Sequence, residues 1–478
     1  MENLFAWINS VLKFVGPLSD FFWDIPTQFS WYKNLPLLGS FSFAIIVLVG
    51  SGIYFSLRLH FIQLTHMGEA IRLLVNRRSA ATGISPLAAF MLSSAMRVGP
   101  GNILGVTGAI SVGGPGALFW MWVSAFFGMA TAFVEGTMAQ LFKEKRQGAF
   151  VGGLPFYGRA LFGGSRNVGI FLSLLYIFYA LGCLPAQGYN VVSSVGAIGS
   201  MITGAEIPTN SFFYYGTAAV VLLFTAVLAF GGIKKVTQAT NAMVPVMAVV
   251  YVATTVLLIV ANADSVPYFF QAVFAGAFRP EAFFGGVFGT VLVQGVKRGL
   301  MSNEAGQGTI TMSAASADDQ HPCEQGLLSA AGVFLDTHII CTMTGLVVVI
   351  SGLWKTDLNG AALTNAAFLQ AYPAFGGYML MVGLVLFAFT TILGWNYYGE
   401  RCMEYLVGVK GIMPYRVGFI VLVGCGAFLK LESIWILADI VNGLMAIPNL
   451  IGVFLLSKTV FKLTREYFET EGKDPFLS

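Results

Sequence analysis

Apolar segments of about 20 residues recur along most of this 478-residue chain, and they constrain its fold more than any other feature of the sequence. A helix of that length crosses a hydrocarbon core of about 30 Å at about 1.5 Å per residue. Hydrophobic residues make up 56% of the chain and charged residues 10%, a balance far from that of soluble domains. The segments lack the alternating pattern of barrel strands. The sequence therefore predicts an all-α integral membrane protein embedded in a lipid bilayer.

We expect about eleven transmembrane helices in a membrane domain over residues 39–457. Residues 1–38 are expected to form an extracellular or interfacial segment, and residues 458–478 a cytoplasmic tail. The expected spans are 39–59, 84–112, 115–140, 167–200, 211–231, 240–262, 281–301, 325–351, 376–398, 415–431 and 434–457.

Most of the 26 Lys and Arg residues fall on one side of these spans. That side holds Arg58 to Arg78, Lys143 to Arg166, Lys234 and Lys235, Lys297 and Arg298, Arg401 to Arg416, and the tail. By the positive-inside rule it is cytoplasmic. We therefore expect a multi-pass protein of the plasma membrane with its N-terminus outside and its C-terminus in the cytoplasm. The net charge of +3 then reflects topology, and no nucleic-acid partner is expected.

Residues 91–105, "MLSSAMRVGPGNILG", interrupt the expected span 84–112. A straight helix of this length would measure about 43 Å, longer than the bilayer core. Pro100 removes a backbone donor, and its flanking glycines permit unwinding. Freed backbone groups survive in a membrane only where protein, water or a ligand bonds them. The half-helix beginning near Asn102 could then receive a carboxylate, and carbonyls near Val98 could receive Na⁺. A simple proline kink is the alternative.

The span 281–301 contains "FFGGVFGTVLVQG", with Gly285, Gly286, Gly289 and Gly295, and precedes a polar run expected in the cytoplasm. Close helix packing is an alternative reason for such glycines. This span lies five spans after 84–112 and runs in the opposite direction. Without the first span, ten remain, and each half of five opens on an interrupted helix. This arrangement predicts an inverted-repeat secondary transporter whose binding site lies at the membrane midplane.

Two further spans carry polar side chains that could face such a site. Gln187 and Asn190 lie on one face of span 167–200, where amides suit a zwitterionic amino acid, although an interhelical hydrogen bond is equally compatible. Thr390 and Thr391 offer oxygens of the hard type that Na⁺ prefers, and Trp395 could wall a small pocket. Adjacent threonines more often bond to their own helix backbone.

Other charged residues inside the spans are Arg97, Asp336 and Glu135. Arg97 lies too deep to snorkel easily, so we hypothesise that it pairs with Asp336 at similar depth, or else contacts backbone carbonyls or cavity water. Glu135 lies near the cytoplasmic end of its span and suggests a structural or gating carboxylate. No acidic residue is evident beside the first break to carry a proton, yet the sequence leaves Na⁺ and proton coupling open.

Several function classes lack their motifs in this chain. There is no GxxxxGK[ST] loop for ATP, and neither HExxH nor GxSxG occurs, so we expect no enzyme and no catalytic residues. The five cysteines are dispersed without a zinc or disulfide pattern. A symmetric channel filter is also not evident. These observations favour a secondary transporter.

Several blocks of the chain resemble the sodium:alanine symporter family, also described as alanine or glycine:cation symporters. The blocks are "GGPGALFWMWVSAFFG" at residues 113–128, "RVGPGNILGV", "FVEGTMAQ", "VKRGLMSNEAGQGT", "GVFLDTHIICT" and "LFAFTTILGWNYYGE". The resemblance covers roughly residues 39–457 and implies a leucine-transporter-type core of two five-helix inverted repeats. It also implies import of a small neutral amino acid together with Na⁺, without an obligate protein partner.

The family motifs also imply which residues form the site. The implied substrate-binding residues are Gly99, Gly101, Asn102, Gln187, Thr391 and Trp395, and the implied Na⁺ ligands are Thr390 and Thr391 with backbone carbonyls near Val98. Family members usually carry Thr or Ser where this chain has Pro100, so substrate preference or cation geometry could differ here. Proton-coupled import, and sodium-coupled import of another neutral amino acid such as glutamine, are the alternatives.

Overall fold

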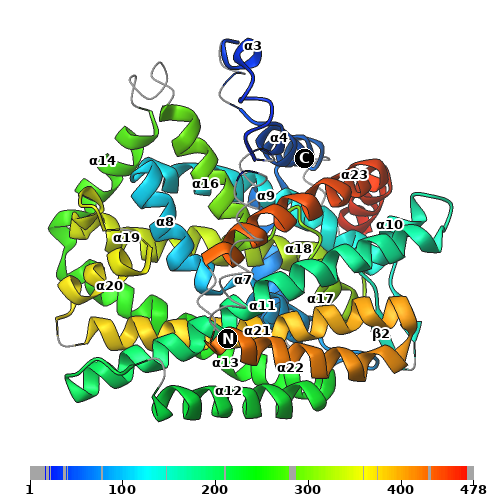
Figure 1. The fold of residues 1–478 in the computed structure, drawn as a ribbon. Helices are drawn as coiled ribbons and strands as arrows, with labels where there is room; N and C mark the ends of the chain where they lie inside the picture. The colour runs from blue at the N-terminus through cyan, green and yellow to red at the C-terminus, as the bar shows by residue number, and fades with distance from the viewer. Residues whose placement is uncertain are drawn as a thin grey trace.

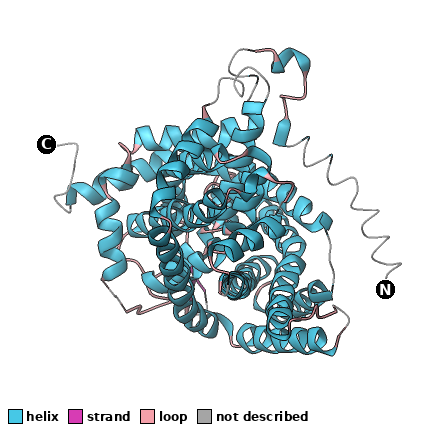
Figure 2. Ribbon diagram, turned by 90° about the vertical axis from the view of Figure 1, so that its left-hand side faces the viewer, coloured by secondary structure: helices cyan, strands magenta, loops and turns pink. Residues whose placement is uncertain are grey.

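The computed structural model describes Pro17, Phe21, Gly39 and residues 23–35, 41–76, 79–146, 148–208, 211–278, 287–358, 360–373, 375–428 and 432–470. Within these ranges almost every element is a helix, as Figure 2 shows. The exception is a hairpin in which β1 (Glu144–Arg146) pairs antiparallel with β2 (Ala149–Val151). The all-α fold class is confirmed.

Eight helical segments in the described ranges are long and apolar enough to cross a membrane by length and composition. They are α9 (Gly116–Leu141), α11 (Arg166–Thr203), α12 (Phe212–Phe230), α13 (Gly232–Ala261), the continuous run Pro322–Ser351, α21 (Gly376–Val407), Val409–Gly426 and Leu444–Glu469. Each overlaps an expected span, with ends that differ by up to about twelve residues. Of the three other expected spans, 39–59 corresponds to the shorter α4 (Phe43–Arg58), 84–112 is interrupted, and 281–301 is described only from residue 287, where it is helical. The total of eleven spans stays a prediction.

Burial separates the inner helices from those at the margin. In Pro322–Ser351, 61% of the most apolar 18-residue stretch is buried inside the protein. In α12 the corresponding share is only 17%. Figure 1 shows α12 along the outer edge of the bundle, with α7 (Pro86–Arg97) inside it. The inner run comprises α18 (Pro322–Val333), a π-helical turn at Phe334–Cys341 and α19 (Thr342–Ser351). A polar site in this protein is therefore surrounded by protein, not by lipid.

The interruption expected within 84–112 is present. After α7 the chain forms a 3₁₀ turn at Pro100–Asn102 and continues as α8 (Leu104–Gly113). Pro100 occupies the first position of the turn, where its missing N–H removes no helical hydrogen bond. The broken helix thus follows from the Gly-Pro-Gly sequence itself.

The second interruption lies later than we expected. Residues of α16 (Val287–Asn303) are helical through Gly289 and Gly295, and Gly285 and Gly286 lie outside the described residues. The helix instead stops at Glu304 and resumes as α17 (Thr311–Ser316). Its φ of 59° at Glu304, followed by positive φ at two glycines, ends the helix there.

The glycines of α16 serve a different purpose. A Cβ on Gly295 would lie 2.5 Å from the carbonyl oxygen of Ala117 and 2.7 Å from Cβ of Trp120, both on α9. Close helix packing therefore explains the glycine at position 295. It is the alternative reason given above for the glycines of this span.

Lys297 and Arg298 belong to α16 and lie within the expected span 281–301, but the polar run after them, expected in the cytoplasm, is buried inside the protein. Lys297 is 8% exposed, and the polar run that follows is buried through Ser316. The two basic residues suggested a cytoplasmic position for this run, since positive charge normally marks the cytoplasmic end of a span. Removing two residues leaves the excess of basic charge on the same side.

The two interrupted helices lie beside one another and run in opposite directions. A Cβ on Gly101 would lie 4.0 Å from Cα of Ser302, whereas one on Gly113 would lie 3.3 Å from Cα of Val291. Just before α7 and just after α17, Ile84 and Ala317 form an isolated bridge of the parallel type. The antiparallel pairing of the two interrupted helices is what an inverted repeat produces.

Several peripheral elements were not expected. They are the β1–β2 hairpin, α10 (Leu154–Ala160), α14 (Val266–Ala277) and α20 (Gly360–Ala371). In addition, α23 (Glu432–Thr470) continues past residue 457, where we placed the start of a separate tail. Tyr467 and Phe468 near its end are buried, and their rings contact His321 and His66. These packing contacts hold the helix against the bundle.

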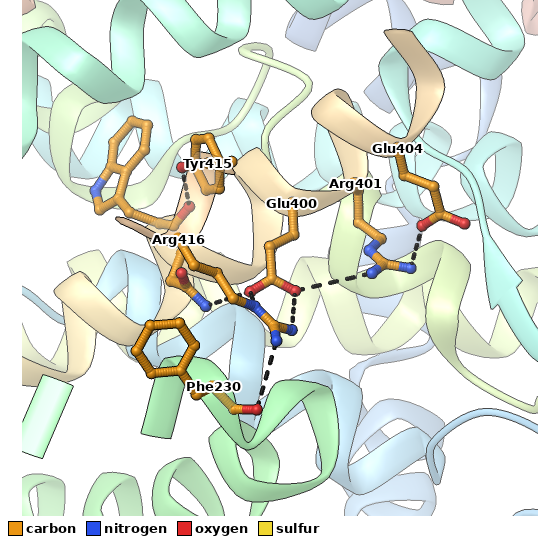
Figure 3. Close-up of polar contacts among 8 residues, drawn as sticks. Phe230, Glu400, Arg401, Glu404, Tyr415 and Arg416 are labelled. Atoms are coloured by element: carbon orange, nitrogen blue, oxygen red, sulfur yellow. Dashed lines mark hydrogen bonds and ion pairs between the residues drawn. The ribbon is translucent and has the colours of Figure 1, made fainter. Parts of the chain in front are cut away.

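An ion pair ties together the ends of three helices (Figure 3). Arg416 of α22 (Ile412–Phe428) donates from Nε and Nη2 to the two carboxylate oxygens of Glu400, at 2.7 and 2.9 Å. Its Nη1 donates to the carbonyl of Phe230 at the end of α12, at 3.4 Å. The Glu400 side chain is 2% exposed, so this two-pronged contact is shielded from water.

We expect Glu400→Ala to lower the free energy of unfolding by about 3 kcal/mol, because it leaves a largely buried guanidinium without its carboxylate. Thermal unfolding of the detergent-purified protein measures the change. Glu469→Ala removes one partner of an exposed pair with Arg465 and should change stability by less than about 1 kcal/mol. Equal effects of the two substitutions would contradict the prediction.

Candidate functional site

A small buried cavity of about 60 Å³ lies where the two helix breaks meet. Its lining comes from both interrupted helices and from α11 and α21. The lining residues are Met96, Arg97, Gly99, Pro100, Gly101, Tyr179, Cys183, Ala186, Gln187, Met301, Glu304, Thr391 and Trp395. Five of the six expected substrate-binding residues are among them.

The first break is held in shape by its own residues. The N–H of Gly99 donates to Oδ1 of Asn102 at 2.8 Å, and the N–H of Asn102 donates to the Gly99 carbonyl at 3.1 Å. A Cβ on Gly99 would lie 2.7 Å from Oγ1 of Thr391, too close for any residue with a side chain. Glycine at this position lets α7 approach α21.

Asn102 is the expected site residue that does not line the cavity. Its Nδ2 instead donates to Oδ1 of Asp336, at 2.6 Å. Oδ2 of the same carboxylate accepts from Ser302 at 2.8 Å and from Thr337 at 2.9 Å. Asp336 lies in the π-helical turn, which shifts side chains relative to a regular helix. The cluster therefore connects the first break, the end of α16 and the π-helical turn.

Gln187 lies on α11, lines the cavity and is 7% exposed. Its Oε1 has no hydrogen-bond partner in the described part of the chain. A buried carbonyl oxygen without a donor costs about 1 to 3 kcal/mol. This oxygen is thus available to a donor that enters the cavity. Asn190, expected beside it, is buried but is not a lining residue.

Aromatic side chains form one wall. Trp395, which is 3% exposed, packs edge-to-face on Tyr179 with ring centroids 4.6 Å apart, and stacks on Tyr176 at 5.6 Å. The hydroxyl of Tyr415 donates to the carbonyl of Trp395, at 3.4 Å. These contacts hold Trp395 from two sides.

The two threonines face different neighbours. Oγ1 of Thr391 donates to the carbonyl of Phe387, at 2.8 Å, and lies 3.3 Å from the carbonyl of Ala95 on α7. Thr390 bonds within its own helix and reaches only Met247 of α13. The expectation that both hydroxyls face the first break is therefore wrong for Thr390. Successive residues on a helix are about 100° apart, so only one can face α7.

The second break is clamped by Glu135 of α9, which is fully buried. Its carboxylate accepts from the N–H groups of Gly306 and Gly308, at 3.1 and 2.9 Å. Asn449 of α23 donates both to Glu135 and to the Gly306 carbonyl, and Tyr157 of α10 donates to Asn449. The structural role expected for Glu135 is explained by these contacts.

Sequence reasoning missed Glu304, which is 4% exposed and lines the cavity. The expectation that no acidic residue lies beside the first break is therefore wrong. Glu304 belongs to the polar run "SNEAGQGT", which could have indicated a buried polar site. We expected this run in the cytoplasm because it follows Lys297 and Arg298. The hypothesised Arg97–Asp336 ion pair is also not formed among the described residues, because Asn102, Ser302 and Thr337 occupy the carboxylate.

Residues 30–476 match the model of the sodium:alanine symporter family. The Sodium/alanine symporter AgcS of Methanococcus maripaludis is 40% identical over 439 residues, covering 89% of this chain and 94% of that protein. The probable sodium/glutamine symporter GlnT of Bacillus subtilis is 36% identical over 440 residues, covering 90% and 89%.

The fold has a counterpart among solved structures. The crystal structure of MhsT in complex with L-phenylalanine matches with a TM-score of 0.57 at 12% identity, covering 80% of this chain and 90% of that one. At this identity the match concerns the fold alone. The family match extends over nearly the whole chain and includes both helix breaks and every helix that lines the cavity. This chain belongs to the sodium:alanine symporter family.

Proposed function

We propose that this protein imports a small neutral amino acid of the alanine or glycine type together with Na⁺ across the plasma membrane, by alternating access. The observation that carries the proposal is the cavity between the two helix breaks. Gln187 lies in its lining, and its Oε1 has no hydrogen-bond partner among the residues that the structure describes. An amino acid's ammonium group is the donor that this oxygen lacks. We keep the proposed orientation, with the N-terminus outside and the C-terminus in the cytoplasm.

The cation would lie beside the substrate, between α7 and α21. Thr391 contributes a hydroxyl oxygen there, and the carbonyls of Ala95 and Phe387 are within its hydrogen-bonding reach. Carbonyl and hydroxyl oxygens suit a hard cation such as Na⁺. The backbone carbonyl of Val98, at the end of α7, completes the proposed set. A cation held by both helices would favour the conformation in which they are close.

Two alternatives have specific support. GlnT is named as a probable sodium/glutamine symporter, so glutamine is a second candidate substrate; the cavity volume of about 60 Å³ favours a shorter side chain. Coupling to protons is supported by the buried carboxyl of Glu304 in the lining. An ion-replacement experiment separates proton from sodium coupling.

We expect uptake of labelled alanine into proteoliposomes to require external Na⁺ and to stop when the sodium gradient is collapsed. The measurement compares sodium with choline buffer at constant pH, with protein-free vesicles as the control. Uptake that is equal in both buffers but follows an imposed pH gradient would replace the sodium proposal with proton coupling.

Gln187→Ala should weaken alanine binding by about 1 to 3 kcal/mol, or roughly 5- to 150-fold, because it removes the acceptor for the ammonium group. Calorimetric titration of the purified protein in sodium buffer measures the affinity. Asn190→Ala lies one turn along the same helix but outside the lining, so it serves as the matched control and should bind normally. Unchanged affinity in Gln187→Ala would show a purely structural amide.

Thr391→Val keeps the side-chain shape but loses the oxygen, so we expect a several-fold higher Na⁺ concentration for half-maximal uptake. Thr391→Ser keeps the oxygen and should be mild. Because binding is linked, saturating Na⁺ should restore much of the apparent alanine affinity in the valine variant. Thr390→Val is the control, since its hydroxyl faces α13. A sodium dependence unaltered in both Thr391 variants would contradict the proposed cation site.

A further inference from the structure

Arg97, the last residue of α7, is a buried cation for which the proposed transport cycle has no role so far. It is 2% exposed and lines the cavity. Its Nε, Nη1 and Nη2 have no hydrogen-bond partner anywhere in the described ranges of the chain. Burying an unpaired guanidinium is strongly unfavourable unless an anion reaches it in some functional state.

The neighbouring carboxylates already have other partners. Glu304, Asp336 and Glu135 all interact electrostatically with Arg97, but none forms an ion pair with it among the residues described. Glu135 accepts from Gly306, Gly308 and Asn449, and Asp336 accepts from three side chains. Glu304 accepts from Thr309, at 2.9 Å. The positive charge is thus balanced at a distance, while its donors stay free.

A glycine on a neighbouring helix makes room for the Arg97 guanidinium. Gly332 of α18 has no side chain, and a Cβ there would collide with Nη1 of Arg97. The guanidinium therefore lies tightly against the α18 backbone. An arginine held in this way presents its planar donors in a fixed orientation, which suits a carboxylate.

The backbone N–H groups at the start of the second half-helix were also expected to bind a carboxylate. Two of them already donate to carbonyl oxygens of the protein. The N–H of Asn102 donates to Gly99, and that of Ile103 donates to the carbonyl of Pro100, both at 3.1 Å. These bonds belong to the 3₁₀ turn itself. The guanidinium of Arg97 is the stronger anion receptor at this cavity, because charge-assisted hydrogen bonds exceed neutral ones.

We propose that Arg97 binds the α-carboxylate of the transported amino acid, while Gln187 receives its ammonium group. This inference rests on the proposed function and deepens it, since it assigns the two charged ends of the substrate to opposite groups of the lining. It also explains why a buried guanidinium without a fixed partner lies at the break. The site would accordingly select ligands that carry a free carboxylate.

The test compares alanine with alaninamide, which keeps the ammonium group but has no carboxylate. Wild-type protein in sodium buffer should bind alanine far more tightly. In Arg97→Gln, alanine affinity should fall roughly 10- to 100-fold, as expected for hydrogen bonds to a charged group, while alaninamide should change less than about threefold. The preference for the carboxylate would thereby collapse. Arg97→Lys keeps the positive charge but loses the planar, bidentate guanidinium, so its alanine affinity should lie between those of the wild type and Arg97→Gln.

Gln187→Ala is the comparison variant, because it should weaken both ligands alike and keep the preference. If Arg97→Gln weakens both ligands by the same factor, Arg97 only balances internal charge and the inference is overturned. If Arg97→Gln changes the affinity of neither ligand, the inference is also overturned, although the proposed function stands. If the wild-type protein binds no neutral amino acid at all, the proposed function fails first, and this inference fails with it.

A second variant keeps the test decisive if Arg97→Gln does not fold. Gly332→Ala leaves the charge in place but displaces the guanidinium, so it should also reduce the preference for alanine over alaninamide. Gly108→Ala on α8 is the matched control, because a Cβ there meets nothing within 4 Å, and it should retain the wild-type preference. Equal preferences in the two glycine variants would argue against the assignment.

Discussion

Backbone groups released at the two helix breaks must be bonded inside the protein, because the bilayer core contains no water to bond them. The rest of the site depends on this constraint. One side chain within the first break and one from a distant helix satisfy it: Asn102 receives the N–H of Gly99, while Glu135 of α9 receives those of Gly306 and Gly308. These contacts support both breaks, and the cavity lies between them.

The supporting contacts also connect the elements that the proposed alternating access would have to move. Asp336 links the first break to the end of α16, and Thr391 lies within reach of α7 from α21. A substrate bound to Arg97 and Gln187 would add a bridge between α7 and α11, and a cation at Thr391 would add one between α7 and α21. Ligands that join the same elements favour the same conformation, which is the physical basis of coupling.

Local chemistry made the first break predictable, whereas the second was misplaced. Gly-Pro-Gly removes a donor and loosens the backbone wherever it occurs, so the interruption at Pro100 is visible in any context. Around Glu304 the local sequence is polar and glycine-rich, which equally describes a cytoplasmic loop. Only the packing of α9 and α23, with Glu135 and Asn449, shows that this run is buried.

By itself, the sequence determined the membrane class, the approximate positions of the apolar spans, the first break and five of the thirteen residues that line the cavity. Hydrophobicity and helix-breaking residues act locally, so they can be recognised along the chain. Tertiary structure decided which of Thr390 and Thr391 faces α7, that Asn102 supports the break from behind the lining, and that Arg97 lies unpaired beside Glu304. These outcomes depend on rotation about a helix axis and on partners more than 200 residues away, which no local pattern encodes.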